Sequence, residues 1–138
     1  MRAVLLALAA SAALPASAEA ATVRVSAPPG GADRQLTVTL LGPTGVTVAR
    51  DGNNVLLYAR PGDTLTQLGP GCTTFLGGLR CGSESSFGRI TVTGSPGDDE
   101  ITISPSITRA TTIAGGGGDD VIAGGGGPDT IDGGDGAD

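Results

Sequence analysis

Hydrophobic and polar residues alternate along five short segments in the first two thirds of the chain. Val, Ile and Leu fill most of the apolar positions, and dipeptides that contain Pro or Gly separate the segments. Alternation of period two with β-branched residues, bounded by turn residues, predicts β-strands. The predicted strands lie at residues 22–25, 36–40, 46–48, 54–58 and 89–93. We therefore expect residues 21–93 to form an all-β segment of short strands.

A different pattern runs from residue 115 to residue 138. It is one nine-residue unit, GGGGDDVIA then GGGGPDTID, followed by GGDGAD, which reaches the sixth position of a third unit. Gly holds the first, second and fourth positions, and an internal period of this kind is the signature of a repeat architecture. Ile holds the eighth position, at Ile122 and Ile131, with Ile113 one period earlier. Asp holds the sixth position, at Asp120, Asp129 and Asp138.

Each position of the unit has a physical role. Six glycine-rich residues form a turn whose backbone needs φ values that a Cβ disfavours. Such a turn directs carbonyl oxygens inward, and the Asp adds a charged oxygen. Ligands made only of carboxylate and carbonyl oxygen suit a hard cation, which indicates Ca²⁺. The last three residues run extended, and the Ile of each unit is expected to point inward and stack on the next.

These units resemble the repeats-in-toxin (RTX) calcium-binding proteins, whose repeat is the nonapeptide GGxGxDxUx. The resemblance implies that two units make one coil of a parallel β-roll and that Ca²⁺ binds between turns stacked on the same edge. The turn at 115–120 would then stack on the turn at 133–138, and the turn at 124–129 would have no visible partner above it. The metal-binding residues predicted from these units are Asp120, Asp129, Asp138, Gly116, Gly118, Gly125, Gly127, Gly134 and Gly136.

Residues 94–102, GSPGDDEIT, fit the same unit with Ser at the second position and Asp99 at the sixth. This unit begins 21 residues before the next, so an irregular coil is expected between them. Asp99 completes the predicted set of calcium ligands. We expect residues 94–138 to form RTX-like β-roll repeats, truncated in mid-unit at Asp138. The alternative, a disordered Gly/Asp linker, has no reason to place Ile at every ninth position.

Composition and charge limit the possible functions. The chain has 25 Gly, 2% aromatic residues and no His. Without His it has no Ser-His-Asp triad and no HExxH zinc motif, and we predict no catalytic residues and no enzymatic activity. From residue 94 onward nine acidic residues face one Arg, whereas residues 21–93 have four acidic residues and six Arg. Such an acidic block repels nucleic acid, so calcium ions are the expected partner, and no protein partner can be named.

Residues 1–20 have the features of a signal peptide. A basic start at Arg2 precedes an apolar core at residues 4–14 and the small-x-small site Ala18-Glu19-Ala20, with a second possible cleavage site at residues 16–18. The apolar core is too short to span a bilayer. We therefore expect a secreted protein that is extracellular or associated with the cell surface and has no membrane span. A membrane anchor is the alternative.

Cys72 and Cys81 are the only cysteines. In an exported protein such a pair predicts a disulfide, and two free thiols are the alternative. A tight turn at Gly77-Gly78 would place Cys72 opposite Ser83, so we expect a closed loop rather than a directly opposed pair. Two sulfurs without His do not complete a zinc site.

The resulting hypothesis is a secreted protein whose glycine and aspartate turns bind structural Ca²⁺ and couple ion binding to folding outside the cell. The alternative is the N-terminal fragment of a larger exported RTX enzyme or toxin, such as a protease, lipase or haemolysin. A surface adhesin is a third possibility. Further nonapeptides after residue 138 would favour the calcium-binding protein, and a catalytic motif there would favour the enzyme.

Overall fold

A computed structural model of the chain describes residues 22–26, 34–67 and 70–138. The predicted signal peptide at 1–20 lies outside the described residues. Nearly all described elements are strands, and the one helical element is the short 3₁₀ helix η1 (Glu84–Ser86). No helix in the described ranges has the length and apolar character that crossing a membrane would require.

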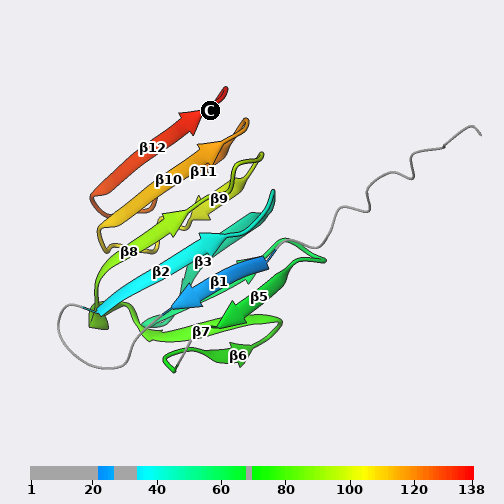
Figure 1. The fold of residues 1–138 in the computed structure, drawn as a ribbon. Coiled ribbons are helices and arrows are strands. Elements are labelled where there is room, and N and C mark those ends of the chain that lie inside the picture. Colours follow the sequence, from blue (N-terminus) through cyan, green and yellow to red (C-terminus); the bar gives the residue numbers. More distant parts are fainter. Residues whose placement is uncertain (1–21, 27–33, 68–69) are drawn as a thin grey trace, which may run out of the picture.

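The strands form two six-stranded sheets that face each other (Figure 1). In sheet order, the first contains β12 (Asp129–Asp135), β10 (Thr111–Gly117), β8 (Phe87–Thr93), β2 (Arg34–Leu40), β1 (Thr22–Ser26) and β5 (Thr64–Gln67). The second contains β11 (Val121–Ala123), β9 (Glu100–Ile103), β3 (Gly45–Asp51), β4 (Asn54–Ala59), β7 (Gly78–Ser83) and β6 (Thr73–Phe75). All five predicted strand segments lie within these strands, whereas β5, β6 and β7 were not predicted.

The chain alternates between the two sheets and stacks each strand on the equivalent strand of the previous coil. It passes from β2 to β3, later from β8 to β9, then from β10 to β11 and into β12. Strands β2, β8, β10 and β12 pair in parallel, as do β3, β9 and β11. Strands β4, β7 and β6 extend the second sheet by antiparallel pairs on the side of β3 away from β9.

The predicted all-β class is confirmed, because strands make up nearly all of the regular structure in the described ranges. The finer prediction of a parallel β-roll is not established by these pairings. The second sheet mixes parallel and antiparallel pairs, and β1 is antiparallel to β2 in the first. The division at residue 93 stays a prediction, although both sheets contain strands from either side of it.

The interior between the sheets is a ladder of aliphatic side chains. Along the first sheet Val38 pairs with Val92, Val92 with Ile113, and Ile113 with Ile131. Their exposed fractions are 0%, 0%, 1% and 48%, because β12 is the edge strand of its sheet in the described part of the chain. We call residues 34–103 the apolar base and residues 111–138 the repeat tail.

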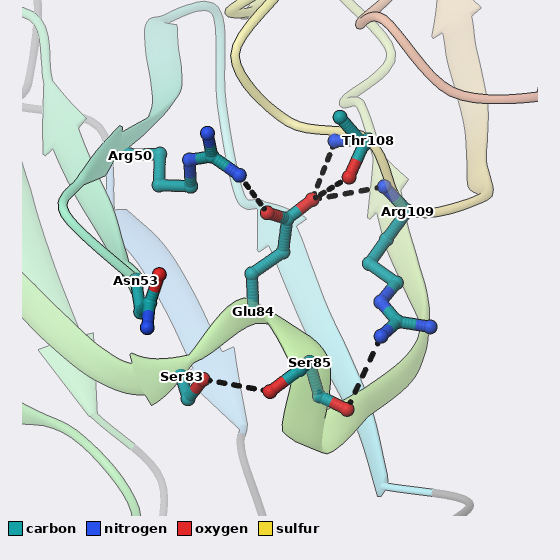
Figure 2. Close-up of a pocket in the computed structure, with 7 residues that line it drawn as sticks. All are labelled: Arg50, Asn53, Ser83, Glu84, Ser85, Thr108 and Arg109. Atoms are coloured by element: carbon teal, nitrogen blue, oxygen red, sulfur yellow. Dashed lines mark hydrogen bonds and ion pairs between the residues drawn. The ribbon is translucent and has the colours of Figure 1, made fainter.

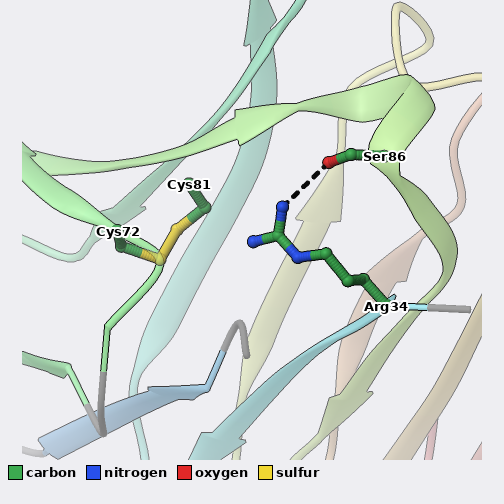
Figure 3. The surroundings of a disulfide bond; sticks show 4 residues. All are labelled: Arg34, Cys72, Cys81 and Ser86. Carbon is green, nitrogen blue, oxygen red and sulfur yellow. Dashed lines mark hydrogen bonds between the residues drawn. A yellow bond between two sulfur atoms is a disulfide. The ribbon is translucent and has the colours of Figure 1, made fainter. Parts of the chain in front are cut away.

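The predicted disulfide between Cys72 and Cys81 is present (Figure 3). The expected hairpin register is wrong. Strands β6 and β7 pair Thr73 with Arg80, which places the two cysteines directly opposite each other with their Cα atoms 4.0 Å apart. The turn is formed by Leu76 and Gly77, whose φ angles are 46° and 78°. A turn with two central residues of positive φ matches the right-handed twist of the strands. Because the turn lies one residue earlier than the expected Gly77-Gly78, the register of the hairpin changes.

Candidate metal centre

Three glycine-rich turns, at residues 94–99, 115–120 and 133–138, stack on one edge of the two sheets. Strands β10 and β12 pair Gly116 with Gly134, as the nine-residue period predicts. The backbone N–H of Gly117 donates to the carbonyl of Ser95 at 3.1 Å, and that of Gly118 donates to the carbonyl of Asp135 at 2.9 Å. Each turn therefore contacts the turn of the previous coil through its backbone.

Carboxylates also connect the stacked turns. Oδ1 of Asp120 accepts a hydrogen bond from the backbone N–H of Asp99 at 2.9 Å. Oδ1 of Asp138 accepts one from the backbone N–H of Asp120 at 3.0 Å. In both residues one carboxylate oxygen thus accepts a hydrogen bond from the turn of the preceding coil.

The second carboxylate oxygen of Asp120 is buried and has no hydrogen-bond partner. The residue is only 3% exposed. A Cβ added to Gly115 would overlap both Asp120 Oδ2 and the carbonyl oxygen of Gly133, so oxygens from two successive turns lie on the same side of this glycine. A buried polar atom without a partner is costly, and a cation would satisfy this one. The residues present therefore fit a calcium ion.

Acidic side chains alone do not form this site. Within residues 22–26, 34–67 and 70–138, no group of three or more Asp, Glu or Cys side chains is placed to hold a metal. An ion here would need backbone carbonyls in addition to the carboxylate of Asp120, and Ca²⁺ accepts such mixed oxygen ligands. Of the predicted glycines, Gly116, Gly118, Gly134 and Gly136 lie in this stack.

The turn at residues 124–129 connects β11 to β12 and lies at the opposite ends of the strands from the other three turns. The backbone N–H of Gly126 donates to the carbonyl of Ile107 at 2.8 Å, so the turn stacks on the irregular loop at 104–110. Gly125 and Gly127 lie against carbonyls of the same loop. Oδ1 of Asp129 is buried without a partner, which leaves this position open to an ion, although its neighbouring loop is not a repeat turn.

The structure places two further predicted ligands differently. Asp138 lies at the exposed end of the stack, where its Oδ1 is bonded to the turn at 115–120. Asp99 is as buried as Asp120, but both of its oxygens accept backbone hydrogen bonds, from Thr44 at 2.9 Å and from Ser95 at 2.6 Å. The three carboxylates share a position in the repeat and differ in their partners.

Glu84 forms a buried polar site that sequence reasoning missed (Figure 2). Its Oε2 pairs with the guanidinium of Arg50 at 2.8 Å. Its Oε1 accepts from the backbone N–H of Thr108, from the Thr108 hydroxyl at 3.1 Å and from the backbone N–H of Arg109 at 3.0 Å. The adjoining polar pocket measures about 220 Å³. The one available signal is that Glu84 is the only acidic residue between Asp63 and Asp98.

The environment of Glu84 lowers the pKa of its carboxyl group. Burial raises the pKa, but the hydrogen bonds from Arg50, Thr108 and Arg109 stabilise the charged form and outweigh it. Glu84 is therefore ionised, and its carboxylate holds the loop at 104–110 through these hydrogen bonds. This loop supports the turn at 124–129, so the carboxylate anchors the second edge of the stack.

Comparison with known proteins agrees with this geometry. No curated protein and no solved structure matches the chain. A family model does match, that of the RTX calcium-binding nonapeptide repeat (4 copies), over residues 109–138. The match includes the turns at 115–120, 124–129 and 133–138 and lies beyond the apolar base. The C-terminal part of this chain thus matches the RTX calcium-binding repeats, as its nine-residue period predicts.

Proposed function

We propose that the repeat tail binds Ca²⁺ between the glycine-rich turns at 115–120 and 133–138, and that the ion holds these coils together as a parallel β-roll. The observation that carries the proposal is that Oδ2 of Asp120 is buried and has no hydrogen-bond partner. This oxygen and the carbonyl oxygen of Gly133 lie on the same side of Gly115. The match to RTX calcium-binding repeats over 109–138 supports the same ion. The role of calcium is structural.

Ion binding and folding of the tail are coupled through charge. Residues 111–138 contain six Asp and no Lys or Arg, so the carboxylates repel one another when the turns stack. A cation that binds the stacked turns and not the unfolded segment stabilises the folded state by mass action. Extracellular calcium modules bind with dissociation constants of about 10⁻⁴–10⁻³ M. The tail would then be ordered by the calcium concentrations found outside cells.

We further propose that the protein is secreted and works outside the cell. The disulfide between Cys72 and Cys81 favours an oxidising compartment, where such bonds form and persist. The signal-peptide pattern at 1–20 and the proposed millimolar affinity agree with export. Secretion of an unfolded tail would be followed by folding on contact with calcium.

The test is calcium titration of the disulfide-bonded chain from Ala21, by calorimetry and circular dichroism. Asp120→Asn removes the negative charge and one of the two carboxylate oxygens and should weaken calcium binding at least about tenfold, the effect of losing roughly 1.4 kcal/mol. Asp132→Asn is the matched control, because Asp132 also carries one negative charge and its side chain is exposed. This control should change the affinity less than about twofold, since exposed charges are screened.

Two results would contradict the proposal. Equal loss of affinity in the two variants would show that the acidic tail attracts counter-ions diffusely. An equal gain of β-structure with Mg²⁺ and with Ca²⁺ would show charge screening alone, since Mg²⁺ demands a tighter octahedral site and releases water reluctantly.

A further inference from the structure

The turn at residues 94–99 has the repeat frame but a different backbone at its second position. Gly116 and Gly134 hold that position in the next two turns, with φ angles of 115° and 103°. Ser95 holds it here, and Leu76 is the only non-glycine residue with positive φ in the described part of the chain. Ser95 therefore has an ordinary φ, and its N–H points back to Asp99 Oδ2 at 2.6 Å.

The coil beneath this turn also differs from a repeat unit. The connection between β2 and β3 reads Leu41-Gly42-Pro43-Thr44 and has no acidic residue. The ring of Pro43 packs against the turn, since a Cβ added to Gly97 would lie 2.5 Å from Pro43 Cγ. The backbone N–H of Thr44 donates to Asp99 Oδ1 at 2.9 Å, and its hydroxyl contacts Asp63. Beneath the turn at 94–99, backbone amides and a proline ring thus take the place that a further repeat turn would have.

We infer that Asp99 is a positioning residue that joins the turn at 94–99 to the β2–β3 connection beneath it without an ion, rather than a calcium ligand. Its two carboxylate oxygens accept the N–H groups of Thr44 and Ser95, whereas Asp120 at the same repeat position keeps one buried oxygen free. Charge-assisted hydrogen bonds of this kind are strong and need no metal to complete them. For the turns at 115–120 and 133–138, the inference rests on the proposed calcium binding.

The ion-free turn has a consequence for the order of assembly. The turn is fixed to the β2–β3 connection by a further backbone hydrogen bond, from the N–H of Glu100 to the carbonyl of Thr44 at 2.8 Å. It presents the N–H of Asp99 to the carboxylate of Asp120. The turn at 94–99 is therefore preformed without calcium, and the first calcium-binding turn stacks on it from above.

Amide hydrogen exchange, resolved by NMR on the full disulfide-bonded chain from Ala21, distinguishes the ordering of the turn at 94–99 from the ordering of the turn at 115–120 that stacks on it. In EDTA the N–H groups of Thr44 and Ser95 should already be protected, at least about tenfold more than that of Asp99. Raising Ca²⁺ to roughly 10 mM, above the range of extracellular modules, should then protect the Asp99 amide by at least tenfold. Thr44 and Ser95 should change less than about threefold. If all three amides are unprotected in EDTA and gain protection together, the inference is wrong.

The Asp99→Ala variant gives a second and independent measurement. It should remove the protection of the Thr44 and Ser95 amides with and without calcium, while the number of calcium ions bound in calorimetry stays that of the unmodified chain. Asp120→Asn should do the opposite, lowering calcium binding and leaving the Thr44 amide protected. Loss of one bound calcium in Asp99→Ala would identify Asp99 as a ligand and overturn the inference. If the unmodified chain binds no calcium, the proposed function fails, and the Thr44 and Ser95 amides in EDTA still decide whether the turn is preformed.

Discussion

The apolar base and the repeat tail contribute strands to the same two sheets, but their interiors are filled differently. In the base, strands β2, β3, β8 and β9 each supply two or more buried aliphatic residues, such as Leu36 and Val38 in β2, or Ile101 and Ile103 in β9. In the tail each strand supplies one Ile, and the other positions are mostly Gly, Ala, Thr and Asp. Burial of one aliphatic side chain contributes about 1.5–3 kcal/mol. The tail has less of this stabilisation and therefore depends more on its turns.

The two regions also balance buried carboxylates differently. In the base, the anionic Glu84 pairs with the guanidinium of Arg50 and with backbone N–H groups. In the tail, Asp120 has a buried oxygen without a partner, and residues 111–138 contain no Lys or Arg that could pair with it. In the base an arginine side chain balances the buried carboxylate, and in the tail a metal ion is proposed to do so. The comparison indicates that base stability should not depend on calcium, whereas tail stability should.

The largest expected effect is on the apolar ladder. Ile101→Ala removes a side chain that is 0% exposed in the base and should lower the free energy of unfolding by about 2–5 kcal/mol. Ile131→Ala makes the same chemical change where the side chain is 48% exposed and should cost less than about 1 kcal/mol. Urea denaturation at a saturating calcium concentration, where the tail is proposed to be folded, measures both. Similar losses would show that the tail is packed as tightly as the base.

The disulfide should come next in size. Replacing both Cys72 and Cys81 by Ala opens a loop with a sequence separation of nine residues and should cost about 2–3 kcal/mol of stability. The loss should be the same in EDTA and in calcium, because Cys81 lies in β7 and Cys72 directly precedes β6, and these strands lie at the end of the second sheet opposite β11 (Figure 1). A loss seen only in calcium would mean that the two regions unfold as one unit.

A smaller effect, with a defined pH dependence, is expected for Glu84→Gln. The pKa of Glu84 is lower in the folded state than its usual 4.5, so its contribution is complete above about pH 4.5 and is lost as pH falls through the folded-state value. The substitution should cost about 1–2 kcal/mol near neutral pH. It should also reduce the fall in stability on acidification. Denaturant titrations from pH 7 to pH 3 test this, and an unchanged acid profile would contradict the assigned role.

The smallest effect is expected for an exposed ion pair of the base. Arg60 and Glu100 lie 3.7 Å apart with both side chains largely exposed. Arg60→Ala should change stability by less than about 0.5 kcal/mol and should leave calcium affinity unchanged. A larger change in calcium affinity would show that charges of the base reach the binding turns, which the comparison of the two regions does not predict.

Much of the fold could be predicted because its determinants are local in the sequence. Period-two alternation located β2, β3, β4 and β8, and the nine-residue period located the stacked turns at 115–120 and 133–138. Strands β5 and β6 were missed because they are short, and β7 was missed because it contains two Gly and no β-branched residue. The parallel pairing of β2 with β8 joins segments separated by a long insertion, and no local pattern encodes such a pairing.

By itself, the sequence determined the repeat, the positions of its Asp residues and the kind of ion that such turns would accept, because these follow from residue type and spacing. Only the tertiary structure decided what each carboxylate contacts. Asp99 and Asp120 hold the same place in the unit, yet a partner of Asp99 is the N–H of Thr44, 55 residues away. The state of a buried carboxylate depends on the donors that the neighbouring coil brings to it, and the neighbouring coil is set by long-range strand pairing rather than by the repeat itself.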